Sequence, residues 1–275
     1  MPAPTALRIE PGILPQMTAR LTIEYDGGRF AGWARQPGRL TVQGELETAL
    51  QTILREPVSL TVAGRTDAGV HALAQVASYE GPLADTKPVN AVLPPEIAVL
   101  ACEAAADGFD ARRDATSRAY CYRVLAQRER SVFERGRALW WPHRCDPEAL
   151  EACAALLPGT HDFTAFTPTE TEHVRFARDV LAAWWDVSGP AYAFWIEADA
   201  FMRNMIRVLV GTMLEVASGR RSPESFEALL EGRPRSQAGA TAPPHGLYFA
   251  GAGYGAPVLG EEAFAAVFAR VRGDR

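Results

Sequence analysis

The chain has 275 residues, of which 48% are apolar and 22% charged, a balance typical of a globular protein with one large domain or two ordinary ones. No apolar run approaches the roughly 18 residues that a membrane helix needs, and the N-terminus lacks the pattern of a secretory signal. A net charge of −5 argues, as a sum, against nucleic acid as a partner. The distribution argues otherwise, because nine arginines lie between positions 112 and 144 against three acidic residues.

The cysteines and histidines predict neither a metal centre nor a disulfide framework. The four cysteines, at positions 102, 121, 145 and 153, form no C-x-x-C pair, and the five histidines form no cluster with metal-ligand spacing. This pattern indicates free thiols, as expected of a cytoplasmic protein.

The N-terminal part is predicted to be an α+β domain spanning residues 18–113. Residues 1–17 are rich in proline and are predicted to be a disordered tail, which leaves open whether Met1 or Met17 is the native start. The expected elements are strands at 20–25 and 58–62, a helix at 43–55, a strand at 70–79, a short helix at 89–93 and a strand at 97–105. This β-α-β-β-α-β order is typical of a ferredoxin-like unit.

The remaining residues, 114–275, are predicted to form a second α+β domain. The expected elements are a strand at 115–124, helices at 147–157, 201–217, 222–231 and 261–272, and a hairpin of strands at 178–187 and 192–198. Asp146 and Pro147 are a typical helix start, and Gly219 is a typical helix end.

A polar turn with a glycine on each side, residues 64–69, joins two strand-like segments. Asp67 lies at its centre and Arg65 two residues earlier, so both side chains point to one face if the backbone is extended. A guanidinium nearby keeps a carboxylate ionised, and an ionised Asp in a cleft can act as a nucleophile or a base. The ordinary alternative is a solvated turn in which Asp67 and Thr66 bond to nearby backbone N–H groups.

The longer run Gly-Arg-Thr-Asp-Ala-Gly-Val-His-Ala, residues 64–72, resembles the signature of the TruA-type tRNA pseudouridine synthases. Weaker resemblances to that family follow in order over residues 20–253, at 25–36, 109–112, 161–166 and 242–249. The resemblance implies a pseudouridine synthase fold: two ferredoxin-like (RRM-like) halves with antiparallel sheets and an active-site cleft between them. It also implies conversion of uridine to pseudouridine at positions 38, 39 and/or 40 in the anticodon stem-loop of tRNA, no cofactor, and a homodimer.

The same resemblance, together with the placement of the residues, predicts roles for seven positions. Asp67 is implied to be the catalytic residue, oriented by Arg65, with Arg207 as the basic residue beside it. Tyr120 is implied to lie against the target base, and Leu247 to form the other wall. Arg112 is implied to help hold the RNA backbone, and Arg203, one helical turn before Arg207, is expected to contact phosphate. Whether the Asp attacks C6 of uracil or acts at C1′ of ribose stays open.

Several residues also have ordinary structural interpretations. Phe30 and Trp33 are expected to pin their loop as an apolar cluster rather than to stack on RNA. Tyr122 is expected in the core, and His71 is expected to be a structural hydrogen-bonding residue. Arg203 and Arg207 lie one helical turn apart, which alone fits a solvated face equally well.

Two rival functions remain at this stage. The first is an RNA-binding module without catalysis, for which Asp67 would be dispensable. The second is a small-molecule hydrolase or lyase that uses Asp67 with His71 in a closed pocket. An RNA substrate and the effect of replacing Asp67 discriminate among the three.

Overall fold

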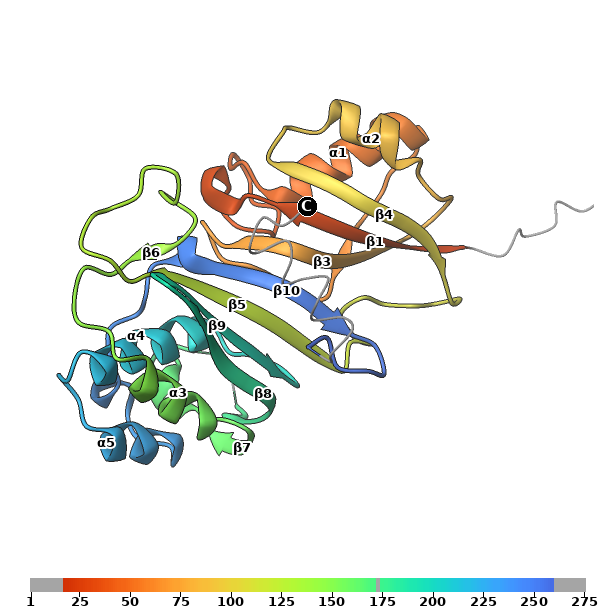
Figure 1. The fold of residues 1–275 in the computed structure, drawn as a ribbon. Helices are drawn as coiled ribbons and strands as arrows, with labels where there is room; N and C mark the ends of the chain where they lie inside the picture. The colour runs from red at the N-terminus through yellow and green to blue at the C-terminus, as the bar shows by residue number, and fades with distance from the viewer. Residues whose placement is uncertain (1–16, 172–173, 260–275) are drawn as a thin grey trace, which may run out of the picture.

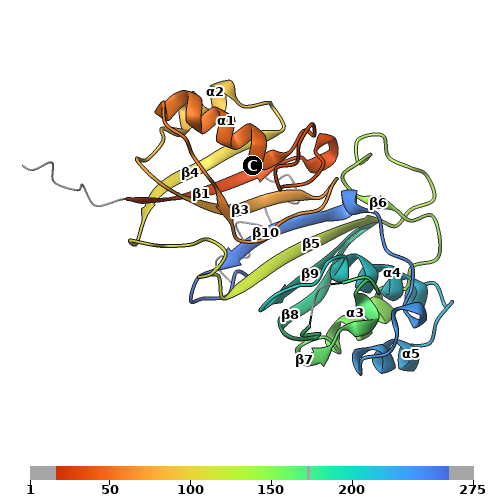
Figure 2. The ribbon, with the colours of Figure 1, turned by 180° about the vertical axis from the view of Figure 1, so that it is seen from behind.

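The computed structural model describes residues 17–171 and 174–259, which form one mixed β-sheet and five α-helices (Figures 1 and 2). The strands are β1 (Thr18–Tyr25), β2 (Thr61–Val62), β3 (His71–Glu80), β4 (Ile97–Ala105), β5 (Ser117–Leu125), β6 (Leu139–Trp140), β7 (Gly159–Asp162), β8 (Ala177–Ser188), β9 (Ala191–Ala198) and β10 (Leu247–Gly253). The helices are α1 (Val42–Leu54), α2 (Thr86–Val92), α3 (Pro147–Ala155), α4 (Met205–Ala217) and α5 (Pro223–Glu227). The predicted α+β class is confirmed. The predicted tail, apart from Met17, and the predicted helix at 261–272 lie outside the described residues.

The sheet runs without interruption through both halves of the chain. Its order is β4-β1-β3-β10-β5-β9-β8-β7, with β2 also paired to β3 and β6 to β5. Most pairs are antiparallel, but β10 runs parallel to β3, with Tyr248 opposite His71 and Phe249 opposite Ala72. The sequence predicted an antiparallel sheet in each half, whereas β10 joins the two into one sheet. The last described strand therefore lies at the centre of the fold (Figure 1).

Helices α1 and α2 lie against the N-terminal strands, as Figure 1 shows. Helix α1 forms because its apolar stripe, Val42, Leu46 and Leu50, is buried against the sheet, and because Thr41 Oγ1 accepts a hydrogen bond from the Gly44 N–H. The helix ends at Arg55, which adopts the left-handed conformation. Its predicted bounds at 43–55 are correct within one residue.

Helices α3 and α4 lie against the C-terminal strands, and α5 packs on α3 and α4 (Figure 2). The prediction that the long helix begins at Phe201 is wrong, because it begins at Met205. Residues 201–204 instead form an irregular segment between β9 and α4 that borders the site described below. Within the described ranges, no helix has both the length and the apolar character needed to cross a membrane.

Candidate active site

The Asp67 loop, defined here as residues 63–70, connects β2 to β3. Thr66 is buried while Arg65 and Asp67 are exposed, so the two charged side chains lie on the same side of the loop, as the sequence predicts. Gly69 has a φ of +79°, a conformation that strains other residues, and the Val70 N–H closes the turn on the Asp67 carbonyl oxygen at 3.2 Å.

A hydrogen-bond network beneath the loop fixes its backbone. Gln75 Nε2 donates to the Gly64 carbonyl oxygen at 2.9 Å, and the Trp33 N–H donates to the Thr66 carbonyl oxygen at 3.0 Å. The Tyr25 and Thr66 hydroxyl oxygens lie 2.7 Å apart. The side chains of Tyr25, Trp33, Thr66 and Gln75 are buried, so the Asp67 carboxylate projects from a rigid support.

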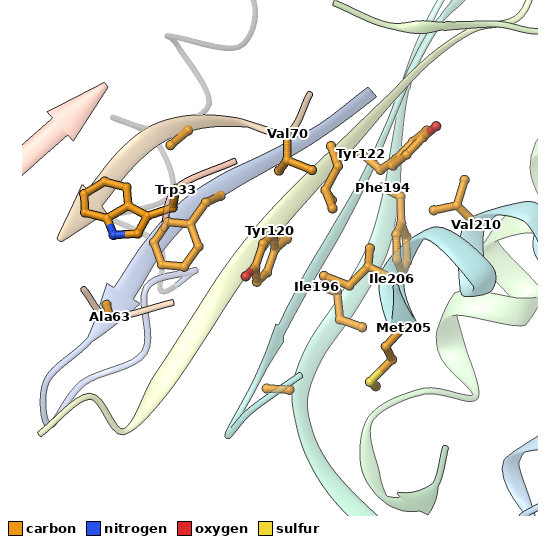
Figure 3. Close-up of a cluster of buried hydrophobic side chains, with 14 of the residues drawn as sticks. Trp33, Ala63, Val70, Tyr120, Tyr122, Phe194, Ile196, Met205, Ile206 and Val210 are labelled. Carbon is orange, nitrogen blue, oxygen red and sulfur yellow. The ribbon is translucent and has the colours of Figure 1, made fainter. Parts of the chain in front are cut away.

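Tyr120 on β5 forms an aromatic wall beside the loop. Its ring is only 8% exposed and makes edge-to-face contacts with Phe201 and Phe249, each with ring centroids 5.1 Å apart. Burial raises the pKa of the Tyr120 hydroxyl, which therefore stays protonated. A Cβ on Gly64 would lie 3.0 Å from Phe249 and 3.6 Å from the Tyr120 hydroxyl oxygen, so the glycine allows the Asp67 loop to pack closely against these two rings. Figure 3 shows Tyr120 between Trp33 and Ala63 on one side and Ile196, Met205 and Ile206 on the other.

Arg207, in the first turn of α4, is the half-buried cation of the site. Its Nε donates to the Ala242 carbonyl oxygen at 2.7 Å and its Nη1 to Asn204 Oδ1 at 2.8 Å. Burial lowers the pKa of Arg207, and the negative charge of Asp67 acts in the opposite direction. Both residues line the same cleft.

The other predicted residues surround this pair. Leu247, at the start of β10, is buried. Arg112 and Arg203 are exposed, and the Arg203 guanidinium donates to the Glu170 carbonyl oxygen at 3.3 Å. Arg203 precedes α4 and does not share a helical face with Arg207, so that geometric prediction is wrong.

All seven predicted site residues line one cleft of about 900 Å³. The residues are Arg65, Asp67, Arg112, Tyr120, Arg203, Arg207 and Leu247. Six arginines and two aspartates contribute to its lining, so the cleft is basic in a chain of net charge −5. A basic cleft with an aromatic and aliphatic wall suits a phosphate-bearing ligand with a flat base.

Arg118, which no sequence motif singled out, also lines the cleft. Its guanidinium donates to the carbonyl oxygens of Ala63, Arg112, Ala115 and Asp199, at 2.7 to 3.1 Å. These acceptors belong to the Asp67 loop, the connection between the halves, and the segment after β9. Arg118 precedes Tyr120 by two residues on β5, so both side chains lie on one face of the strand. That spacing could have predicted that Arg118 lies beside Tyr120 at the cleft.

His71 has a structural role, as predicted. Its ring is buried, its Nδ1 accepts from the Gly27 N–H at 3.0 Å, and its Nε2 lies 3.0 Å from the Gly136 carbonyl oxygen. It does not line the cleft, so the geometry provides no Asp67–His71 pair for a hydrolase. Phe30 and Trp33 are likewise buried, which confirms the prediction of an apolar cluster. Tyr122 is fully buried in the core, again as predicted.

Comparison with known proteins identifies related sequences. A family model described as tRNA pseudouridine synthase matches residues 153–255. The tRNA pseudouridine synthase A of Bacillus pumilus is 38% identical over 239 residues, which cover 84% of this chain and 97% of that protein. The protein of the same name from Cereibacter sphaeroides is 39% identical over 244 residues, covering 85% and 96%. That of Bacillus subtilis is 38% identical, covering 84% and 97%.

Among solved structures, a chain from a crystal structure of a Cbf5-Nop10-Gar1 complex covers 71% of this chain and 53% of its own length. Its TM-score is 0.31 at 11% sequence identity, too distant a similarity to carry an argument.

Proposed function

The chain belongs to the tRNA pseudouridine synthase A family, whose members isomerise uridine to pseudouridine in tRNA, and we propose that it acts at positions 38, 39 or 40 of the anticodon stem-loop with Asp67 as nucleophile. One observation carries the site assignment: the seven residues come from distant parts of the sequence and meet in one basic cleft. The isomerisation breaks the N1–C1′ bond, turns the base and joins C5 to C1′. The C5 proton leaves and N1 gains a proton, so atoms and charge balance without any cofactor.

In the proposed mechanism, the side chains of the cleft divide the work. Asp67 attacks either C6 of uracil or C1′ of ribose, and Arg65 orients it. Tyr120 stacks on the uracil, and its hydroxyl relays the C5 proton by accepting it while releasing its own proton to solvent in the cleft. Leu247 forms the opposite wall. Arg207 neutralises the Asp67 carboxylate before the substrate binds.

The basic residues of the cleft support binding of the RNA backbone. Arg112 and Arg203 are exposed, so their guanidinium groups are available for phosphate contacts. A base within the stem must leave the helix first, at a cost of a few kcal/mol that stacking on Tyr120 offsets in part. Affinity is expected to fall steeply with salt, and a dissociation constant independent of salt would contradict the phosphate contacts.

Tritium release tests the reaction. Transfer RNA carrying 5-tritiated uridine at only position 38, 39 or 40 is mixed with enzyme, and forming the C5–C1′ bond must expel the label. The wild-type chain is expected to release tritium, and Asp67→Asn to bind tRNA without release. Asp107→Asn removes an exposed carboxylate from the same half and serves as the matched control. Release by Asp67→Asn at the wild-type rate would refute the role of Asp67, and release from none of the three substrates would refute the positions.

We also propose that the chain forms a homodimer. The loop between β5 and β6 is fixed at its base, where the Tyr248 hydroxyl donates to the Arg137 carbonyl oxygen at 2.6 Å. Its tip nevertheless exposes Phe133 by 88% and Val132 by 72%, which supports a surface that a second subunit covers. Phe133→Glu is expected to give a monomer by light scattering, and Val174→Glu, at a residue 97% exposed elsewhere, is not. A wild-type monomer would contradict the proposal.

We further propose that the halves, 18–113 and 114–275, are each ferredoxin-like. The strand orders β4-β1-β3-β2 and β10-β5-β9-β8 support this topology. Limited proteolysis is expected to cut first between β4 and β5, and protection of that connection would contradict the division. The tRNA substrate and the free thiols support a cytoplasmic location, which cell fractionation tests.

A further inference from the structure

Helix α4 begins in an unusual way. Asn204, the residue before its first turn, has φ +63° and ψ −1°, which is the left-handed region. Residues at this position usually have extended backbone, and their side chains usually accept a hydrogen bond from an N–H of the first turn. Asn204 departs from this pattern in both respects: its backbone is left-handed, and no N–H of α4 donates to its side chain.

Backbone strain of this kind is rare in the described part of the chain. Apart from glycines, only Arg55 and Asn204 have a positive φ in residues 17–171 and 174–259. Arg55 occupies the C-terminal cap of α1, where a left-handed residue is a common way to end a helix. Asn204 instead lines the cleft, and strained residues at such sites persist when the surrounding structure needs them.

The Asn204 side chain instead binds the Arg207 guanidinium. Asn204 Oδ1 accepts from Arg207 Nη1 at 2.8 Å, while Arg207 Nε donates to the Ala242 carbonyl oxygen at 2.7 Å. The Ala242 N–H also donates to the Arg207 carbonyl oxygen at 3.0 Å, so the partner of Nε is itself fixed to α4. Two bonds from different atoms of a planar guanidinium fix both its position and its plane.

The two bonds leave the other guanidinium hydrogens, on Nη1 and Nη2, for the cleft. Arg207 and Asp67 line that same cleft, and the negative charge of Asp67 opposes the lowering of the Arg207 pKa by burial. Without Asn204, Arg207 would be held through Nε alone and could turn about that bond. A small side chain with an acceptor that tolerates a left-handed backbone is needed here, and Asn meets both requirements.

We infer that Asn204 is a positioning residue for the isomerisation: its carboxamide oxygen orients the Arg207 guanidinium toward Asp67 and the bound nucleotide. This inference rests on the proposed roles of Asp67 and Arg207. Asn204 acts through Arg207 and takes no part in proton transfer or bond formation.

The test compares two substitutions under single-turnover conditions with 5-tritiated tRNA. Asn204→Gly removes the acceptor and relieves the backbone strain, so the fold is kept or stabilised. The rate at saturating enzyme is expected to fall roughly tenfold, the effect of losing one charge-assisted hydrogen bond, with tRNA affinity changed less than about threefold. Asn204→Asp keeps an acceptor and tolerates the same backbone, so its rate should stay within about threefold of wild type.

Two controls separate positioning from a structural effect. Arg55→Gly relieves the same kind of strain far along the chain and should leave the rate unchanged. In an Arg207→Lys background, whose ammonium group cannot make the two-point contact, Asn204→Gly should slow the reaction less than twofold further.

The outcomes distinguish this inference from the proposed function. A wild-type rate for Asn204→Gly, or the full tenfold loss in the Arg207→Lys background, would overturn the role of Asn204. A loss in Asn204→Asp equal to that in Asn204→Gly would also overturn it, because the acceptor would then be irrelevant. If Asp67→Asn is inactive in the same assay, the proposed reaction stands whichever of these results is obtained.

Discussion

A buried pair of hydroxyl groups supports the Asp67 loop from below. The Tyr25 and Thr66 hydroxyl oxygens lie 2.7 Å apart, and Gln75 Nε2 approaches the Tyr25 oxygen at 3.4 Å. Gln75 donates to the Tyr25 oxygen, and between the two hydroxyls either one can be the donor. Burial raises the pKa of Tyr25 to about 12, so the hydroxyl stays protonated across the working pH range.

Thr66→Val keeps the shape of the side chain and removes the hydroxyl partner of Tyr25. The buried Tyr25 hydroxyl would then keep only its longer contact with Gln75 Nε2, which costs about 1–3 kcal/mol of unfolding free energy. Replacing both partners, Tyr25→Phe with Thr66→Val, removes the poorly satisfied hydroxyl as well. The double variant is therefore expected to lose less than the sum of the two single losses, with a coupling on the order of 1–2 kcal/mol.

Urea unfolding of the four proteins measures this coupling, and tritium release measures activity. The rate should fall less than about tenfold in Thr66→Val, because the Trp33 N–H and Gln75 Nε2 still hold the loop backbone. Thr52→Val removes an exposed hydroxyl on α1 and should change stability by less than about 0.5 kcal/mol. Strictly additive losses would refute the argument that the two hydroxyls are partners.

Three further predictions concern the support of the site and the sheet. Gly32→Ala should lower the free energy of unfolding by more than about 2 kcal/mol and slow tritium release, because Gly32 has a φ of +98° and a Cβ there would lie 2.8 Å from the Thr66 carbonyl oxygen. The control is Gly38→Ala, where φ is +69° and the surrounding space is open. This variant should lose less unfolding free energy. Glu197→Gln should cost about 2–3 kcal/mol in urea unfolding, because this fully buried carboxylate accepts hydrogen bonds from two backbone N–H groups after β10; an unchanged midpoint would contradict this. Burial lowers the pKa of His71 from 6.5, so the unfolded chain binds that proton more readily. Its contribution to stability is therefore complete above pH 6.5 and is lost as the pH falls through the lower folded pKa, and His71→Asn should flatten this dependence of the urea midpoint.

Local sequence determined the elements and the turn that presents Asp67. The apolar stripe of residues 42–50 defines α1, because burial of one helical face requires that spacing. The glycine-flanked turn around Asp67 lies between two strands, and its alternation alone places Arg65 on the same side as the carboxylate. These features depend on neighbours within about one or two turns of chain, so they can be read without the fold.

Contacts between distant segments decided the rest. Asn204 has a left-handed backbone and its side chain binds Arg207. A right-handed helix cannot include a left-handed residue, so α4 begins at Met205 and not at the predicted Phe201. The four acceptors of Arg118 come from three segments that only the folded sheet brings together. Likewise, β10 lies at the centre of the sheet because it pairs with β3 on one side and with β5 on the other. No local pattern in residues 247–253 encodes these two partners. Hydrogen-bond partners far apart in sequence are fixed by tertiary packing, and so the geometry around Asp67 is a property of the whole fold.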